Sequence, residues 1–117
     1  MCVETNLMGG AEVDRGETDA IFLHLTGRWV LQILIALSQG QMRFTSLRRA
    51  IPRVSANVLT TRLRELETAH LVTRTTLPPP ASYQVYELGP LAEELRPALD
   101  YLDRWRVSLP ELLESVS

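Results

Sequence analysis

The stretch RFTSLRRAIPRVSANVLTTRLREL, residues 43–66, contains six arginines. Arginine has a planar guanidinium that donates hydrogen bonds in a fork suited to phosphate oxygens and guanine edges. Seven arginines and two glutamates give residues 43–74 a net charge of +5, whereas residues 1–42 have −3 and residues 75–117 have −4. A basic region between acidic flanks is typical of a surface that binds a polyanion, although an arginine-rich solvated face has the same composition.

Two short helices on either side of Pro52 are predicted to hold these arginines. Thr45 is expected to cap the first, over Ser46–Ile51, and Pro52 ends it because proline lacks a backbone N–H. Ser55 is a suitable N-cap for the second, which is predicted to run to about Ala69. At about 100° per residue, the apolar residues of this second helix share one face: Ala56, Leu59, Leu63 and Leu66.

The opposite face of the second helix is polar, as a helix that reads base edges in a major groove requires. Asn57 is a candidate for reading adenine, or it assists the N-cap. Thr60 and Thr61 are either DNA contacts or plain surface residues, and DNA contact is favoured because β-branched residues are mediocre helix formers. Arg64 is the better base or phosphate contact, whereas Arg62, at the edge of the buried face, either binds DNA or pairs with an acid inside the domain.

Other basic residues lie where contacts with phosphates would position this helix. Three arginines lie between the start of the first short helix and the second helix, and another lies in the segment that follows. The candidate DNA-binding residues are Arg43, Arg48, Arg49, Arg53, Ser55, Asn57, Thr60, Thr61, Arg64 and Arg74.

Upstream of this region, the sequence predicts an arm and two helices. Residues 1–16 have no sustained period and are expected to form a mobile arm before one domain over residues 17–117. Thr18 is expected to cap a short helix that ends before Gly27. The stretch RWVLQILIALSQG predicts a helix at the domain centre, because its apolar surface is broad. Its apolar stripe has i, i+3, i+4, i+7 spacing: Val30, Ile33, Leu34 and Leu37.

Downstream, the hydrophobic period changes from 3.6 to 2. LVTRTTL and SYQVYEL, joined through PPPA, predict a hairpin over about Leu71–Leu88. Gly89 and Pro90 are expected to begin a last long helix with an apolar stripe. Pro97 is expected to bend this helix, and Pro110 to separate a short terminal helix from it.

The order of these elements is that of a winged helix-turn-helix, an α+β fold that is mostly α. A closer resemblance covers about Asp19–Trp105, in the segments LTGRWVLQILIAL, MRFTSLRRAIPRVSANVLTTRLRELETAHLVTRT, PPPASYQVYELG and LRPALDYLDRW. Similar proteins have Gly-(Arg/Lys)-Trp before the second helix, Leu-Thr-x-Arg-Leu-(Arg/Lys)-x-Leu in the recognition helix and a proline-rich wing before Tyr. The chain therefore resembles the HxlR-type winged-helix transcriptional regulators, relatives of the MarR group.

This resemblance implies a dimeric repressor on a pseudo-palindromic operator in double-stranded DNA, with N- and C-terminal dimerisation helices. The apolar stripe of the last helix agrees, since it exceeds what a small head needs to cover. The implied interface residues are Ile21, Phe22, Leu25, Leu95, Leu99, Leu102 and Trp105. Ligand-responsive relatives also imply a small-molecule effector, with His24, Trp29 and Trp105 as candidate pocket residues; otherwise the tryptophans pack the core and the dimer seam.

Two features differ from the family pattern. Family members often have a sensing cysteine just ahead of the first helix, but this stretch reads DRGETDA, and the only cysteine is Cys2. Thiol sensing is therefore not expected. The wing tip LPPPAS also lacks the basic residue that many wings have, so strong minor-groove contact by the tip is not expected.

Several other classes of function are not expected from the sequence. It has no nucleophile–base arrangement, glycine-rich phosphate loop or metal-ligand cluster, so we expect neither an enzyme nor a cofactor. It has no signal peptide and no apolar run long enough to span a bilayer, which predicts a cytoplasmic protein. The alternative to a DNA-binding regulator is a winged-helix ligand-sensing or protein-interaction module that no longer binds DNA. The basic region and polar helix face argue against it.

Overall fold

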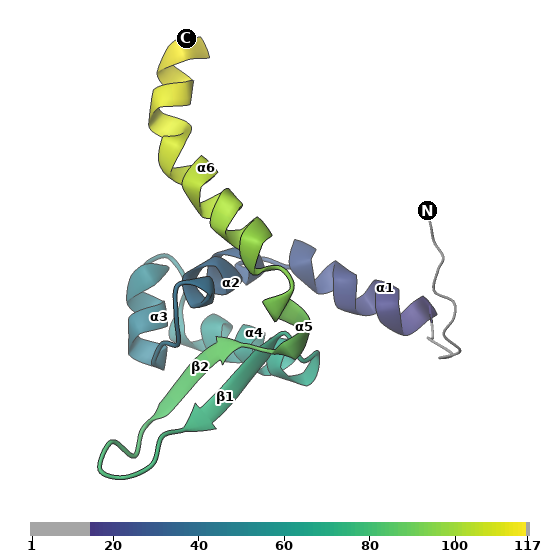
Figure 1. Ribbon diagram of the computed structural model, residues 1–117, viewed down its shortest axis with the longest axis vertical. Helices are drawn as coiled ribbons and strands as arrows, with labels where there is room; N and C mark the ends of the chain where they lie inside the picture. Colours follow the sequence, from purple (N-terminus) through teal and green to yellow (C-terminus); the bar gives the residue numbers. More distant parts are fainter. Residues whose placement is uncertain (1–14, 117) are drawn as a thin grey trace.

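A computed structural model describes residues 15–116, in which a two-stranded hairpin packs at its base against a group of helices and projects from them at its tip (Figure 1). The elements, in chain order, are α1 Arg15–Leu23, the 3-10 helix η2 His24–Thr26, α2 Val30–Ser38, α3 Phe44–Ala50, α4 Ala56–Thr68, β1 Val72–Thr76, β2 Gln84–Leu88, α5 Pro90–Glu93 and α6 Arg96–Val116. This order confirms the predicted fold class, a mostly helical winged helix-turn-helix.

The core is built around α2, as its apolar pattern predicted. Val30, Ile33, Leu34 and Leu37 are all at most 2% exposed. They pack with the apolar face of α4, which Leu59, Leu63 and Leu66 supply, and with residues of α3, the hairpin and α6. Because both apolar stripes are buried in the same cluster, the angle of α4 against the rest of the domain is fixed by packing.

The hairpin pairs β1 with β2 in antiparallel register, from Val72 opposite Leu88 to Thr76 opposite Gln84. The linker between α2 and α3 adds to the edge of β2. Met42 donates its backbone N–H to the Tyr86 oxygen at 2.9 Å and accepts the Tyr86 N–H at 2.7 Å. This bridge attaches the hairpin to the start of α3.

Both ends of α4 have well-defined caps. The Ser55 side chain accepts a hydrogen bond from the Val58 N–H at 3.1 Å, so Ser55 rather than Asn57 supplies the N-cap. At the other end His70 has φ +64°, and the Leu71 N–H bonds to the Leu66 oxygen at 2.9 Å, a Schellman motif. The left-handed residue reverses the chain and begins the hairpin directly after α4.

Two predicted N-caps were wrong. Thr18 lies inside the first helix, Arg15–Leu23, and not at its N-cap. The third helix begins at Phe44, with Arg43 at the N-cap position, so Thr45 is also inside its helix. Threonine favours the N-cap position but is also tolerated inside a helix, so its presence alone does not fix where a helix begins. Residues 1–14 of the predicted arm, including Cys2, lie outside the described residues.

The last helix also differs from the prediction. It begins as the short α5 and restarts as α6, and Pro97 lies at the second position of α6, where its missing N–H has no partner to lose. Pro110 lies inside α6 and does not end it. A proline inside a helix removes one backbone hydrogen bond, and here the helix continues on both sides.

Arg96 joins α5 and α6 to the end of α2. Its guanidinium donates to the Ser38 backbone oxygen and to Glu93, with 2.9 Å between Nη2 and Glu93 Oε2. The pKa of Glu93 lies below its ordinary value because Arg96 donates these hydrogen bonds to its carboxylate. α6 therefore leaves the domain from a defined anchor.

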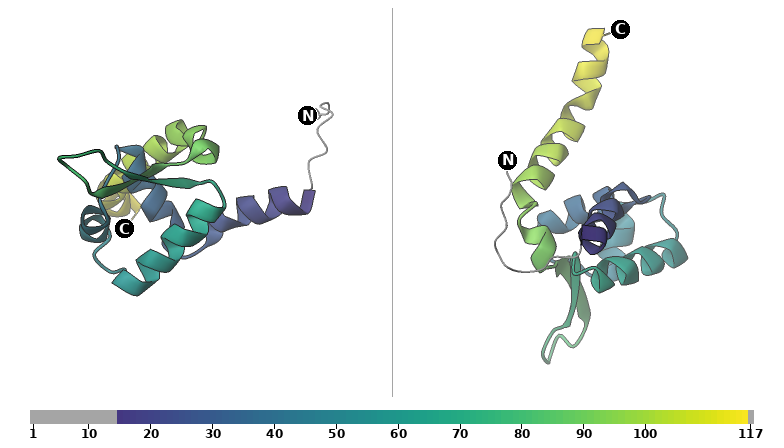
Figure 2. Two further views of the ribbon diagram at one scale, coloured as in Figure 1. Left: turned by 90° about the horizontal axis from the view of Figure 1, so that it is seen from below. Right: turned by 90° about the vertical axis from the view of Figure 1, so that its right-hand side faces the viewer.

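Two helices project from this head. α6 extends away from the side on which α4 and the hairpin lie, and α1 extends in a different direction (Figures 1 and 2). Within residues 15–116, no single helix is long and apolar enough to cross a membrane. Only the pair formed by residues 15–26 and α2 meets those criteria together, and its two parts meet at 85°.

Candidate nucleic-acid interface

The outer face of α4 is the centre of the candidate interface. Asn57, Thr61 and Arg64 are exposed, whereas Thr60 is half-buried. The Arg64 guanidinium has no hydrogen bond or ion pair with any residue of the described chain, although the Arg64 backbone oxygen accepts a bond from the Thr68 hydroxyl at 3.0 Å. A rigid helix thus presents small polar side chains and one unpaired guanidinium to solvent, which suits base edges and phosphates.

Arg62 has a structural position. Its Nε donates to the Arg28 backbone oxygen at 3.1 Å, and its Nη1 lies 2.9 Å from Glu65 Oε1. Arg28 in turn lies over the Trp29 ring, with 5.1 Å between its guanidinium carbon and the ring centroid. Of the two alternatives for Arg62, the structure therefore favours pairing within the domain, which ties α4 to the turn before α2.

Four arginines surround the amino-terminal half of this interface. Arg48 and Arg49 lie in the last turn of α3, and Arg53 lies in the turn between α3 and α4. All three are exposed, as is Arg43 at the start of α3. Because α3 and α4 are adjacent in the chain and share the core, these guanidiniums lie around the same helix-turn-helix unit, where phosphate contacts would position α4.

Arg74 is less available than the sequence suggested. It lies on β1 with its Nε 3.6 Å from Glu67 Oε2, and both side chains are partly exposed. This ion pair joins the wing to the last turn of α4. The sequence did not predict the pair, because the six residues between Glu67 and Arg74 include the change from helix to strand.

Tyr83 is a residue of this surface that the sequence analysis missed. The Arg43 guanidinium carbon lies 4.2 Å from the centroid of the Tyr83 ring, at the end of the hairpin near its tip. The motif of a proline-rich wing before a tyrosine was the available signal, but nothing in it indicates which cation the ring meets.

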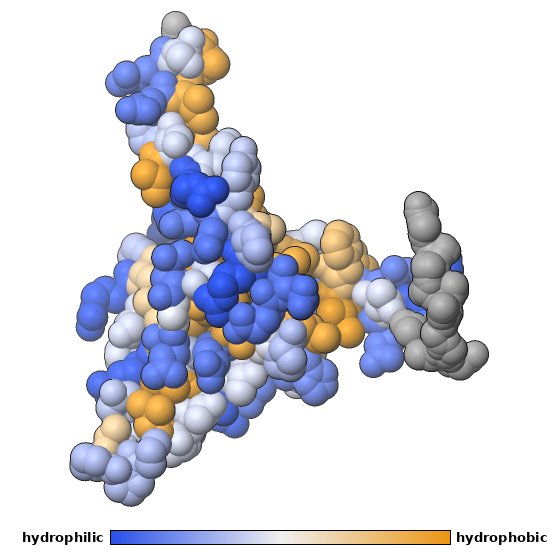
Figure 3. Space-filling model, viewed as in Figure 1, coloured by the Kyte–Doolittle hydropathy of each residue, from blue (hydrophilic) through white to orange (hydrophobic). Residues whose placement is uncertain are grey.

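The residues predicted to form a dimer interface differ in how deeply the single chain buries them. Leu99 is 2% exposed and belongs to the core of a single chain, so its assignment to an interface was wrong. Ile21, Leu25 and Leu95 are half-buried and line a hollow of about 350 Å³ between α1 and α5. Phe22 and Trp105 remain 66% and 50% exposed, and apolar side chains are visible at the base of α1 and along α6 (Figure 3). Leu102 is half-buried.

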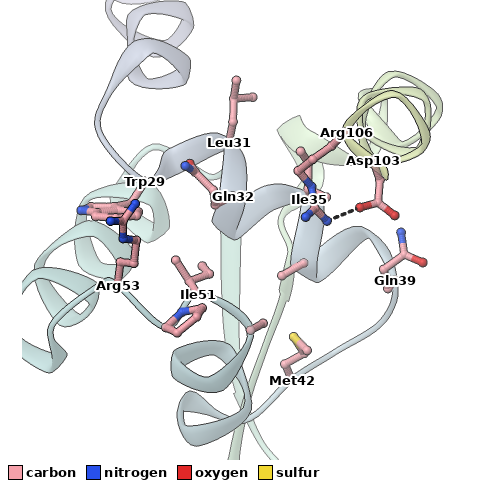
Figure 4. Close-up of a pocket in the computed structure, with 13 residues that line it drawn as sticks. Trp29, Leu31, Gln32, Ile35, Gln39, Met42, Ile51, Arg53, Asp103 and Arg106 are labelled. Atoms are coloured by element: carbon pink, nitrogen blue, oxygen red, sulfur yellow. Dashed lines mark hydrogen bonds and ion pairs between the residues drawn. The ribbon is translucent and has the colours of Figure 1, made fainter. Parts of the chain in front are cut away.

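The three residues predicted to line a ligand pocket do not lie together. A cavity of about 500 Å³ lies between α2, the α3–α4 turn and α6 (Figure 4). Trp29, Ile51, Arg53, Asp103 and Arg106 are among its lining residues, and Arg106 pairs with Asp103 at its rim. His24 instead lines a separate hollow beside α1, with His70, and Trp105 lines neither. The predicted grouping was wrong because Trp29 and His24 line different hollows, and Trp105, 50% exposed on α6, lines neither.

No three histidine, cysteine, aspartate or glutamate side chains within residues 15–116 are arranged to hold a metal ion. His24 and His70 line the same hollow, together with Glu17 and Glu65.

Comparison with known proteins identifies similar chains. The model of the HxlR-like helix-turn-helix family matches residues 24–111. An uncharacterized HTH-type transcriptional regulator of Escherichia coli, YtfH, is 36% identical over 94 residues, which are 80% of this chain and 75% of YtfH. Another from Bacillus subtilis, YkvN, is 38% identical over 82 residues, 68% of this chain and 67% of YkvN.

Solved structures with the same fold are also regulators. The reduced form of the transcriptional regulator YodB from B. subtilis has a TM-score of 0.66 and 28% identity, covering 79% of this chain and 90% of YodB. The redox regulator HypR in its reduced form has a TM-score of 0.66 and 26% identity, covering 84% of this chain and 97% of HypR. The family match, residues 24–111, extends over the head and most of α6.

Proposed function

The chain belongs to the HxlR-like helix-turn-helix family, and on that premise we propose that it is a dimeric repressor that places α4 in the major groove of a pseudo-palindromic operator. It is a transcriptional regulator with a helix-turn-helix DNA-binding fold, not an enzyme. Beyond this family-level function, we propose roles for individual residues, a dimer and a small-molecule effector. The proposal also includes repression of transcription and a location in the cytoplasm.

One observation carries the DNA-binding proposal: the exposed face of α4 is polar, and the guanidinium of Arg64 on it is unpaired within the described chain. Buried leucines hold the opposite face, so this surface keeps its angle without help from DNA. We assign Asn57, Thr60, Thr61 and Arg64 to base reading. The arginines of α3 and its turn, with Arg43 and Arg74, are assigned to phosphate contacts that set the register.

Arg64→Ala and Arg48→Ala test this division of roles. We expect Arg64→Ala to weaken operator binding by about 1–3 kcal/mol and to relax preference at one or two base pairs. Arg48→Ala should weaken binding to all sequences alike and lower the slope of log affinity against log salt by about 0.9, because one phosphate contact is lost. Operators selected from a genomic library, measured across a salt series against random DNA, provide the readout.

Two outcomes would contradict this proposal at different levels. If both variants lose the same affinity on all DNA sequences, the assignment of Arg64 to base reading and Arg48 to phosphate contact is wrong. If the unmodified protein is not retained on heparin and does not bind duplex DNA at low salt, the proposal that it binds DNA is wrong. That second result would instead favour a winged-helix module that senses ligands or binds proteins.

The dimer proposal depends on α6. From residue 102 onward, α6 carries apolar residues at alternating spacings of three and four, the heptad pattern of a helix–helix seam: Leu102, Trp105, Leu109, Leu112 and Val116. Several of these are exposed in the single chain, Val116 by 80%. An unpacked helix of this kind is marginal in water, so a second copy is the partner we propose, with the exposed Phe22 of α1 extending the interface.

We also propose that a small apolar molecule in the cavity of Figure 4 regulates DNA binding. Residues of the α3–α4 turn and of α6 line this cavity together, so an occupant contacts the DNA-binding unit and the proposed dimer helix at once. A ligand with different affinity for two arrangements of these elements shifts their populations.

Leu31→Trp tests the effector proposal by narrowing the cavity. Leu31 lines the cavity and is 38% exposed on α2, so the larger ring is tolerated. A fragment that raises the melting temperature and releases DNA from the unmodified protein should do neither to this variant, while the variant still binds DNA. An unchanged response in Leu31→Trp would move the effector site elsewhere.

A further inference from the structure

Arg43 and Tyr83 form the closest cation–π pair of the described chain. The guanidinium carbon of Arg43 lies over the Tyr83 ring at 4.2 Å from its centroid, compared with 5.1 Å for Arg28 and Trp29 and 5.7 Å for Arg104 and Tyr101. Arg43 occupies the N-cap position of α3, and Tyr83 immediately precedes β2. The pair therefore connects the helix-turn-helix unit to the outer part of the wing.

The backbone on both sides of this pair is fixed. The Leu77 N–H donates to the Tyr83 oxygen at 2.9 Å, which closes the hairpin where Tyr83 lies. The two hydrogen bonds between Met42 and Tyr86 attach the residue before Arg43 to the same strand. Because both backbones are held, the ring and the guanidinium have little freedom to separate. Tyr83 is 38% exposed.

The chemistry of the contact leaves Arg43 able to bind an anion. A guanidinium stacked on an aromatic ring contacts the ring through its planar face, so the N–H groups at the edge of the guanidinium remain available as hydrogen-bond donors. Within residues 15–116, no hydrogen bond or ion pair occupies the Arg43 guanidinium, whereas Arg62 and Arg74 are paired with Glu65 and Glu67. Arg43 is thus both oriented and unneutralised.

We propose that Tyr83 is a positioning residue of the DNA-binding surface: its ring holds the Arg43 guanidinium in the orientation that contacts a backbone phosphate beside the wing. The inference rests on the proposed function, because it assumes that this surface faces DNA. It gives the wing a role that does not need a basic residue at its tip. The wing supplies an aromatic platform, and the cation comes from the start of α3.

Tyr83→Leu, Tyr83→Phe and Arg43→Ala test this role on a random-sequence duplex of about 30 base pairs, which reports phosphate contacts without base reading. Tyr83→Leu is expected to weaken binding roughly three- to five-fold, the size of a partly exposed cation–π contact. Tyr83→Phe should restore the affinity, because the ring face is kept. Arg43→Ala should lower the salt slope by about 0.9.

A double-mutant comparison separates positioning from general damage to the wing. In an Arg43→Ala background, Tyr83→Leu should have no further effect, because the residue that it positions is absent. In an Arg48→Ala background, Tyr83→Leu should cause its full loss, because Arg48 makes an independent contact. Thermal unfolding of each variant checks that the wing is folded.

The outcomes also distinguish this inference from the proposed function. Loss of affinity in Tyr83→Phe would show that the hydroxyl contacts DNA directly and would overturn the positioning role. An equal loss of affinity on Tyr83→Leu in both arginine backgrounds would also overturn the positioning role. So would a result in which Arg43→Ala binds the duplex as tightly as the unmodified protein while Arg48→Ala binds it more weakly. In that last case the DNA-binding function stands, whereas failure of the unmodified protein to bind the duplex would remove the function itself.

Discussion

Replacing both Trp105 and Leu112 with glutamine is expected to leave the protein monomeric and to weaken operator binding by about 100-fold or more. These residues lie on the apolar seam of α6 and are 50% and 46% exposed in the single chain. Two linked recognition helices bind two half-sites as one unit, because the second contact is made at high effective concentration. A monomer loses that gain although each α4 is unchanged.

The physical reason is that the outer half of α6 has little of the head to pack against. The helix projects away from α4 and the wing (Figure 2), and its buried residue, Leu99, lies near its start. Removing two large apolar groups from the seam therefore affects the contact between copies more than the core. The circular dichroism spectrum and unfolding temperature of the head should change little, while light scattering reports the halved mass.

Val107→Gln is the matched control for this prediction. Val107 is 68% exposed on the same helix but lies between the seam positions 105 and 109, about 200° round the helix from each. It should keep both the dimer and operator affinity. A dimer that survives in the seam variant, or one that is lost equally in the control, would contradict α6 as the dimerisation element.

Gly89→Ala is expected to destabilise the domain by about 3 kcal/mol, because a methyl group there meets backbone atoms that cannot move aside. A Cβ on Gly89 would lie 2.6 Å from the His70 oxygen and 2.9 Å from the Leu71 carbonyl carbon. The Gly89 N–H also donates to the Leu71 oxygen at 2.8 Å. Relief of the clash would separate the end of β2 from the turn that follows α4.

Gly27→Ala is the matched control, since it adds the same methyl group in a looser place. Its Cβ would lie 3.2 Å from the His24 oxygen and 3.2 Å from the Val30 side chain, which can yield slightly. Urea unfolding should show a large loss of stability for Gly89→Ala and a small one for Gly27→Ala. Comparable losses would mean that the approach of β2 to His70 is not a tight constraint.

Much of the fold was predictable because the signals are local. The stripe of Val30, Ile33, Leu34 and Leu37 predicted the central helix, and all four are buried. Ser55 and the period change after α4 predicted the recognition helix and the wing, and the structure confirms both. The positions of Thr18 and Thr45 inside their helices, and the continuation of α6 through Pro110, were not predictable from cap and breaker residues, because the rest of a helix outweighs one residue's preference.

The candidate site divides in the same way. Alternation of apolar and polar residues at helical spacing determined that Arg64 faces outward and Leu63 inward, since a helix has one period. Which arginines remain unpaired depended largely on residues brought near by folding: the Arg28 carbonyl for Arg62, Glu67 for Arg74 and the Tyr83 ring for Arg43. The sequence by itself thus determined the elements and their faces, whereas the tertiary structure decided how each cation is used, because electrostatic contacts depend on distances in space.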